Sequence, residues 1–120
     1  MAAIPIGLIA SFICFTAVSL KEKFRYDDSL DVFGVHGVGG MTGALLTGVF
    51  ASVGASGLLS GNPGQLLTQL EGVLASVVYA VACTLIIGYI INETMGLKVS
   101  ESEENIGLDQ TQHGEAAYNT

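Results

Sequence analysis

Long apolar runs without charge constrain the fold of this chain more than any other feature. The first 20 residues contain no Asp, Glu, Lys or Arg, and none occurs between Asp31 and Glu71. About 18 consecutive apolar residues are enough for an α-helix to cross a membrane. Half of the 120 residues are hydrophobic, only 12% are charged, and the mean hydropathy is +0.58. The pattern therefore predicts an all-α, polytopic membrane chain.

Three spans and one polar tail account for the whole sequence. The apolar runs predict spans at about 2–20, 31–52 and 70–91. Turn-forming residues in "GASGLLSGNPGQ" separate the second span from the third. We expect a transmembrane part over 1–97 and a short polar tail over 98–120.

The positions of the basic residues predict the orientation. Lys21, Lys23 and Arg25 follow the first span, Lys98 follows the third, and the 53–69 loop has no basic residue. Basic residues accumulate in cytoplasmic loops, so the first loop and the tail should be cytoplasmic and the amino terminus outside. Three spans that begin outside are an unusual start, and we expect a fragment of a longer protein.

Several functional classes fit the composition poorly. The net charge of −7 arises from acidic residues in the first loop and the tail, and four basic residues give no footprint for nucleic acid. Cys14 and Cys83 lie in apolar segments, where thiols act as small hydrophobes. No arrangement of side chains indicates an enzyme, a metal site or a cofactor, and Asp27 and Asp28 precede a helix as capping residues do.

Glycines crowd the second span. Gly39 and Gly43 form a GxxxG pair, and Gly40 with Ala44 repeats the same small-residue spacing. Small residues let helix backbones approach closely in lipid, where packing drives association. We predict that Gly39, Gly40 and Gly43 pack against other helices.

One histidine lies inside this apolar, glycine-rich run. With Asp28 as N-cap and Asp31 near the positive end of the helix dipole, His36 would lie ~8 residues, or ~12 Å, into the helix. An ionisable residue at that depth is costly and is by default a functional candidate that faces a bundle interior or a cavity. The alternative is a core histidine bonded to a neighbouring helix.

Helical periodicity indicates which residues share the face of this histidine. Val32 lies four residues before His36 and Gly40 four residues after it, so the stripe is apolar. A dry site of this kind penalises both an imidazolium and a permeant cation. It suits a narrow path for a small polar molecule that first loses its charge.

Two stretches carry a resemblance to a known family. The segment "DDSLDVFGVHGVGGMTGALLTGVFA" and the ending "GLKVSESEENIGLDQTQHGEAAYNT" closely resemble the ammonium transporters of the Amt/Mep/Rh family. Members have about eleven spans, so this chain is similar to the last three spans and the cytoplasmic tail. The resemblance implies ammonium or ammonia as substrate, a plasma-membrane location and assembly as a homotrimer with one pore per subunit.

The resemblance also implies roles for particular residues. His36 matches the second of the paired pore histidines, and Val32 the cytoplasmic pore wall below it. Asp31, with Asp28 before it, matches the cytoplasmic start of that helix. His113 lies in the polar tail and is expected to be solvated rather than a partner for the pore histidine. The tail can contact PII-type signalling proteins, through the positions that match the family's ending: Gly107, Leu108, Asp109, His113, Gly114, Glu115, Tyr118 and Asn119.

Two other interpretations stay open. One is a Rh-like channel for ammonia or another small neutral gas, although the "GLD" and "HGEAAYN" motifs of the tail favour the Amt branch. The other is a membrane-anchored ammonium sensor or adaptor that acts through its tail. A tail with five acidic residues and one lysine is usually just a solvated segment.

Overall fold

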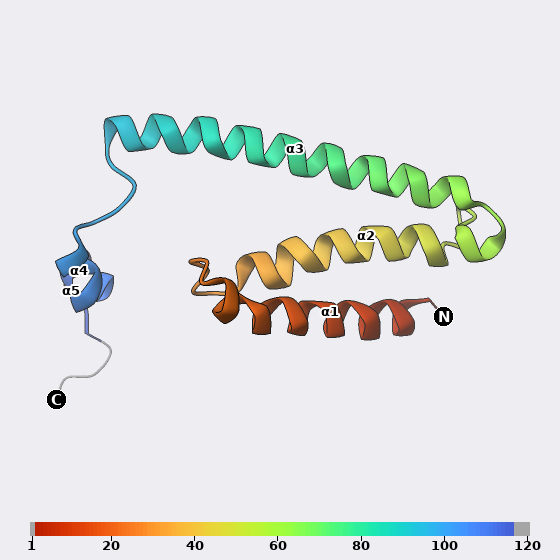
Figure 1. The fold of residues 1–120 in the computed structure, drawn as a ribbon, viewed down its shortest axis with the longest axis horizontal. Coiled ribbons are helices and arrows are strands. Elements are labelled where there is room, and N and C mark those ends of the chain that lie inside the picture. The colour runs from red at the N-terminus through yellow and green to blue at the C-terminus, as the bar shows by residue number, and fades with distance from the viewer. Residues whose placement is uncertain (1, 117–120) are drawn as a thin grey trace. The chain divides into compact units, whose positions relative to one another are not determined.

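The structure is a computed structural model that describes residues 2–116, and every regular element in that range is helical. This confirms the predicted all-α class. The order of elements along the chain is shown in Figure 1. They are α1 (Ala3–Phe24), the π-turn η1 (Phe33–Gly37), α2 (Val38–Phe50), the 3-10 turn η2 (Leu58–Ser60), α3 (Pro63–Thr94), α4 (Glu101–Ile106) and α5 (Leu108–Thr111).

Three stretches are long and apolar enough to cross a membrane: Ala3–Lys21, Phe33–Phe50 and Pro63–Thr94. They confirm the expectation of a multi-pass membrane protein. Among the described residues no hydrophobic side chain is fully buried. The apolar faces of the helices are therefore available to lipid or to further helices.

Glycines set the distance between α1 and the following helix, which lie side by side (Figure 1). A Cβ built on Gly34 would lie 2.9 Å from Val18 Cγ2, and one built on Gly39 would lie 3.0 Å from Cys14 Sγ. Neither position has room for a larger side chain unless Val18 or Cys14 moves. Backbone proximity, rather than interlocking of large side chains, thus defines this pair of helices.

The connection from α2 to α3 is also built around glycine. Gly57 is buried, and its N–H donates to the Ala51 carbonyl at 2.8 Å. A Cβ on Gly57 would lie 2.7 Å from the Gly48 carbonyl oxygen. Gly48 in turn lies against the first turns of α3, where a Cβ would be 3.0 Å from Leu66 Cα. The 51–62 connection is therefore tightly folded.

The first and third helices extend beyond the predicted spans. α1 continues through Lys21 and Lys23 to Phe24, and Arg25 ends it in a left-handed conformation with φ +52°. α3 begins at Pro63, seven residues before the predicted span at 70. Proline is favoured at the first helical position, and the Asn62 side chain accepts a hydrogen bond from Gly64 N–H at 3.1 Å.

The chain divides into two compact units, Met1–Val78 and Tyr79–Thr120, and the division falls inside α3. In the second unit, Ser100 begins α4 with a capping box. Its hydroxyl accepts from Glu103 N–H at 3.4 Å, and Glu103 Oε2 accepts from Ser100 N–H at 3.0 Å. The acidic stretch "SESEEN" thus forms a capped helical turn.

Candidate functional site

His36 lies in the π-turn η1, at the start of the second membrane-capable helix. Within this turn the Val38 N–H donates to the Phe33 carbonyl, five residues earlier, instead of the usual four. Single π-turns of this kind inside helices often occur at functional sites. The turn is wider than an α-turn, so the 3.6-residue period that placed His36 on one face with Val32 and Gly40 is locally altered, although four residues still make roughly one turn.

The helix begins later than the sequence predicted. Val32 is its first residue with helical backbone angles, so His36 lies in the opening turn, roughly half as far along the axis as predicted from a start at Asp28. His36 and Val32 are both exposed in this chain. An exposed imidazole can donate and accept hydrogen bonds while neutral, which suits a site for a small polar molecule.

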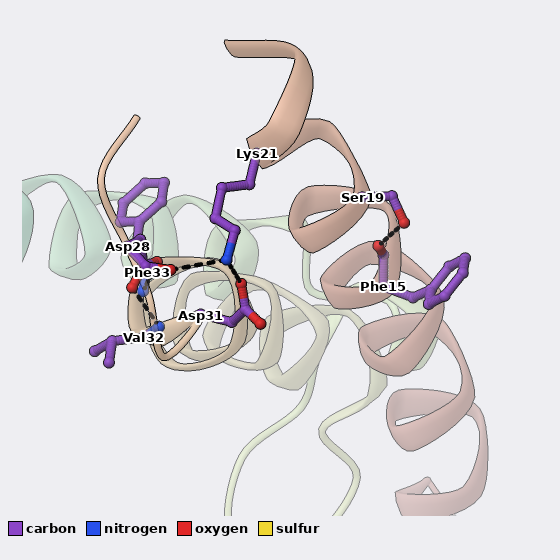
Figure 2. Close-up of polar contacts among 7 residues, drawn as sticks. All are labelled: Phe15, Ser19, Lys21, Asp28, Asp31, Val32 and Phe33. Carbon is purple, nitrogen blue, oxygen red and sulfur yellow. Dashed lines mark hydrogen bonds and ion pairs between the residues drawn. The ribbon is translucent and has the colours of Figure 1, made fainter. Parts of the chain in front are cut away.

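Asp28 caps this helix from four and five residues away. Its Oδ1 accepts the N–H of Val32 and its Oδ2 accepts the N–H of Phe33, both at 2.8 Å (Figure 2). The two bonds satisfy two of the N–H groups that a helix leaves unpaired at its start. The Asp28 carboxylate also lies at the positive end of the helix dipole.

Lys21, at the end of α1, joins that helix to the same site. Its ammonium donates to the Asp28 carbonyl at 2.8 Å and forms an ion pair with Asp31 Oδ1 (Figure 2). The two charged side chains are only 21% and 33% exposed. Asp31 has a left-handed backbone with φ +56°, and its carbonyl accepts from Val35 N–H at 2.8 Å.

The predicted packing glycines fall into two groups. Gly39 faces Cys14 of α1, as described above. Cβ atoms built on Gly40 and Gly43 would meet no heavy atom within 4 Å among the described residues. The two positions therefore leave a thin, open surface on α2.

The tail residues named from the sequence lie in and around α5. Gly107 has φ +111° between α4 and α5, and Gly114 has φ +65° beyond them. Glu115 N–H donates to the Asp109 carbonyl at 2.9 Å, which folds the chain back on α5. His113 is exposed, and Leu108 is the first residue of α5. Tyr118 and Asn119 lie outside the described residues.

Sequence reasoning missed the contacts that hold this site to α1. Lys21 was noted only as an orientation signal, although a lysine near an acidic loop is a ready partner for it. Gly34 and Gly48, which are both buried, are not among the glycines that the sequence analysis predicts to pack. Among the described residues no group of three His, Cys, Asp or Glu side chains could hold a metal ion.

Comparisons with known proteins agree with one another. A family profile described as the Ammonium Transporter Family matches residues 1–118. The chain is 52% identical to an ammonium transporter of Aquifex aeolicus, over 98% of this chain. It is 44% identical to an ammonium transporter of Bacillus subtilis over 98% of this chain, and 42% identical to ammonium transporter Amt1 of Archaeoglobus fulgidus over 97%. It spans 28–30% of the length of these relatives.

Proposed function

The chain belongs to the ammonium transporter family, and from this premise we propose that it supplies part of the wall of a pore for ammonium. In this proposal ammonium loses a proton and crosses the dry part of the pore as ammonia beside His36. The observation that carries the proposal is the position of His36, exposed in the opening turn of a membrane-capable helix in a member of this family. Relatives that match this chain are named as ammonium transporters.

The chemistry of the imidazole supports this role. A cation is strongly disfavoured in a dry, low-dielectric path, whereas neutral ammonia is not. Neutral imidazole offers one acceptor and one donor, so it can orient ammonia and pass a proton without itself becoming charged. A carboxylate at the same position would instead hold a cation.

The remaining predicted residues have supporting roles in this proposal. Val32 contributes an apolar wall next to the histidine, and Asp28 and Asp31 form the cytoplasmic end of that helix. The positive-inside pattern supports a cytoplasmic tail, an external 53–69 loop and an external amino terminus. The location that we propose is the plasma membrane.

We further propose that this segment acts within a larger assembly. The remaining spans of the transporter would complete the pore, and the complete protein would be a homotrimer. The tail over 107–119 would offer a surface to a PII-type signalling protein. A channel for ammonia or another neutral gas, and a sensor that works through its tail, are the alternatives against which this function is tested.

A chimera provides the decisive experiment. In the chimera this chain replaces the segment of the Aquifex aeolicus transporter that it matches, and the purified protein is placed in liposomes. His36→Ala should reduce ammonium-dependent current by roughly 100-fold, because a positioned proton-transfer group contributes at least that much. His36→Asp should change which cations pass, measured with ammonium and potassium gradients.

The matched control is Thr47→Ala on the same helix. Thr47 is exposed, and its hydroxyl donates to the Gly43 carbonyl of its own helix. This variant should keep both current and selectivity. Wild-type current and selectivity in His36→Ala would reduce the histidine to a packing residue. Flux of ammonia without any ammonium-dependent current in the unmodified chimera would favour the gas channel.

A further inference from the structure

We propose that Lys21 is a positioning residue for His36: from the neighbouring helix it fixes the backbone just before the π-turn that carries the histidine. The proposal rests on the pore role of His36 given above. Lys21 touches neither the permeant molecule nor the ring in this proposal. It acts through Asp31 and the Asp28 carbonyl.

The contacts form a short chain from α1 to the turn. The Lys21 ammonium bonds the Asp28 carbonyl and the Asp31 carboxylate, and the Asp28 carboxylate caps the first two N–H groups of the helix. Asp31 accepts the Val35 N–H through its own carbonyl, one residue before His36. Displacement of the Lys21 ammonium would therefore disturb the hydrogen bonds at both ends of the opening turn.

The backbone conformation of Asp31 makes the start of the opening turn depend on Lys21. Asp31 has φ +56°, a left-handed conformation that is uncommon for residues with a side chain, although Asp adopts it more readily than most. The ion pair with Lys21 would hold Asp31 in this conformation, and both side chains of the pair are half-buried. Without it, Asp31 would be free to return to a common conformation and shift the Val35 hydrogen bond.

One face of α1 contacts the turn at three levels. Cys14, Val18 and Lys21 follow the i, i+4, i+7 spacing of a single helical face. Cys14 Sγ lies 3.7 Å from the Val35 carbonyl oxygen, and Val18 lies against Gly34. Lys21 is the last of these three residues along α1 and the charged one. The first two contacts limit how closely the turn approaches α1, whereas the lysine fixes where the turn begins.

The experiment compares three variants in the liposome chimera described above. Lys21→Met keeps the aliphatic stem and removes the charge, and Lys21→Arg keeps a charged donor. Lys23→Met is the matched control, because Lys23 is an exposed lysine two residues away that makes no hydrogen bond among the described residues. The readouts are initial ammonium flux, hydrogen exchange of the amides in 32–38 and in 41–50, and the imidazole nitrogen shifts of His36.

Lys21→Met should lower flux about tenfold, since a misplaced group next to a reacting molecule costs at least that factor. It should also speed exchange in 32–38 by roughly tenfold, as loss of a helix cap does, and move the His36 nitrogen shifts. Exchange in 41–50 should not change. Lys21→Arg should restore most of the flux and the shifts, and Lys23→Met should match the unmodified chimera.

Two results would overturn the inference. In the first, the Lys21→Met variant shows the same amide exchange in 32–38 and the same His36 nitrogen shifts as the Lys23→Met control. The other is that Lys21→Met speeds amide exchange equally in 32–38 and 41–50, and that Lys21→Arg restores neither the flux nor the His36 shifts. The lysine would then stabilise the chain in general rather than position the turn. Failure of the pore role is a separate outcome: His36→Ala would then conduct normally, while the exchange and shift readouts would still decide whether Lys21 positions the turn.

Discussion

Cys14 of α1 lies against Gly39 of α2, and a Cβ built on Gly39 would be 3.0 Å from the cysteine Sγ. Four residues further on, Gly43 has no described neighbour within 4 Å of such a Cβ. One member of the GxxxG pair therefore packs inside this chain, whereas the other faces outward. The two halves of the motif can be tested separately.

Gly39→Leu should weaken the contact between α1 and α2. A larger side chain in a filled contact typically costs about 1–3 kcal/mol in free energy of unfolding. Gly43→Leu should leave that contact intact. Thermal unfolding of the full chain in mild detergent, followed by circular dichroism, compares the two variants. If Gly43→Leu lowers the yield or oligomer size of the assembled chimera, its surface packs against a helix outside this chain; equal melting of both variants and wild type would contradict the first prediction.

Asp28 should be the main cap of the second membrane-capable helix. Asp28→Ala removes two hydrogen bonds to backbone N–H groups, and loss of a cap costs about 0.5–2 kcal/mol. Asp28→Asn keeps only one acceptor oxygen, so it should recover part of that loss. Hydrogen exchange of the Val32 and Phe33 amides measures the effect. Asp27→Ala is the control, and an effect as large as that of Asp28→Ala would show that charge alone, rather than the two bonds, stabilises the helix start.

The orientation can be tested by labelling. Ser56, Asn62 and Ser102 are all exposed in the structure, so a cysteine at any of them is sterically reachable. In a background that lacks Cys14 and Cys83, cysteines at Ser56 and Asn62 should react with a membrane-impermeant reagent added outside intact cells. A cysteine at Ser102 should react only after the cells are opened. Outside labelling at Ser102 would reverse the proposed topology.

The tail should lose helix in acid. The Ser100 hydroxyl donates to Glu103 Oε2 at 2.6 Å and the Ser100 N–H donates to it at 3.0 Å. These two bonds hold the pKa of Glu103 below its ordinary value of 4.5, and the bond from the hydroxyl has the larger effect. A lowered pKa in the folded state means that the stabilisation is complete above pH 4.5 and is lost as the pH falls through the lower, folded value.

Cα chemical shifts of residues 100–111 in the full chain follow this transition. Glu103→Gln should remove most of the pH dependence between neutral and acid conditions, because an amide does not titrate. Glu104→Gln, one residue further on in α4, should preserve it. A titration that is unchanged by Glu103→Gln would assign the acid sensitivity to another carboxylate.

The fold class was predictable because uninterrupted apolar runs leave few options other than membrane helices. The ends of the helices are harder to predict from hydropathy than the fold class. A polar stretch such as 62–69 looks like a loop when hydropathy alone is considered, yet Asn62 and Pro63 carry the capping and first-turn signals that begin α3. Lys21 and Lys23 are good helix formers, so charge did not stop α1 where the apolar run ended.

The site was predictable in part. As a single ionisable residue in an apolar run, His36 was the candidate that the sequence proposed, and Asp28 was predicted to cap the helix start, as the structure shows. The pairing of Lys21 with Asp31 joins residues ten positions apart across a turn whose shape the sequence does not encode locally. The π-turn is also invisible to periodicity, because one widened turn changes the hydrophobic pattern too little to be recognised.

The widened turn at Phe33–Gly37 has a consequence for how this segment tolerates insertions and deletions. A π-turn amounts to an α-helix with one surplus residue, and each residue of an α-helix advances the direction of its side chain by about 100°. Loss of a single codon from this stretch would therefore let an ordinary helix close with every backbone hydrogen bond intact. The membrane would accept such a helix as readily as the original, and the residues after the lost codon would keep nearly their direction relative to Asp31, because the turn loses its surplus residue and its extra width together.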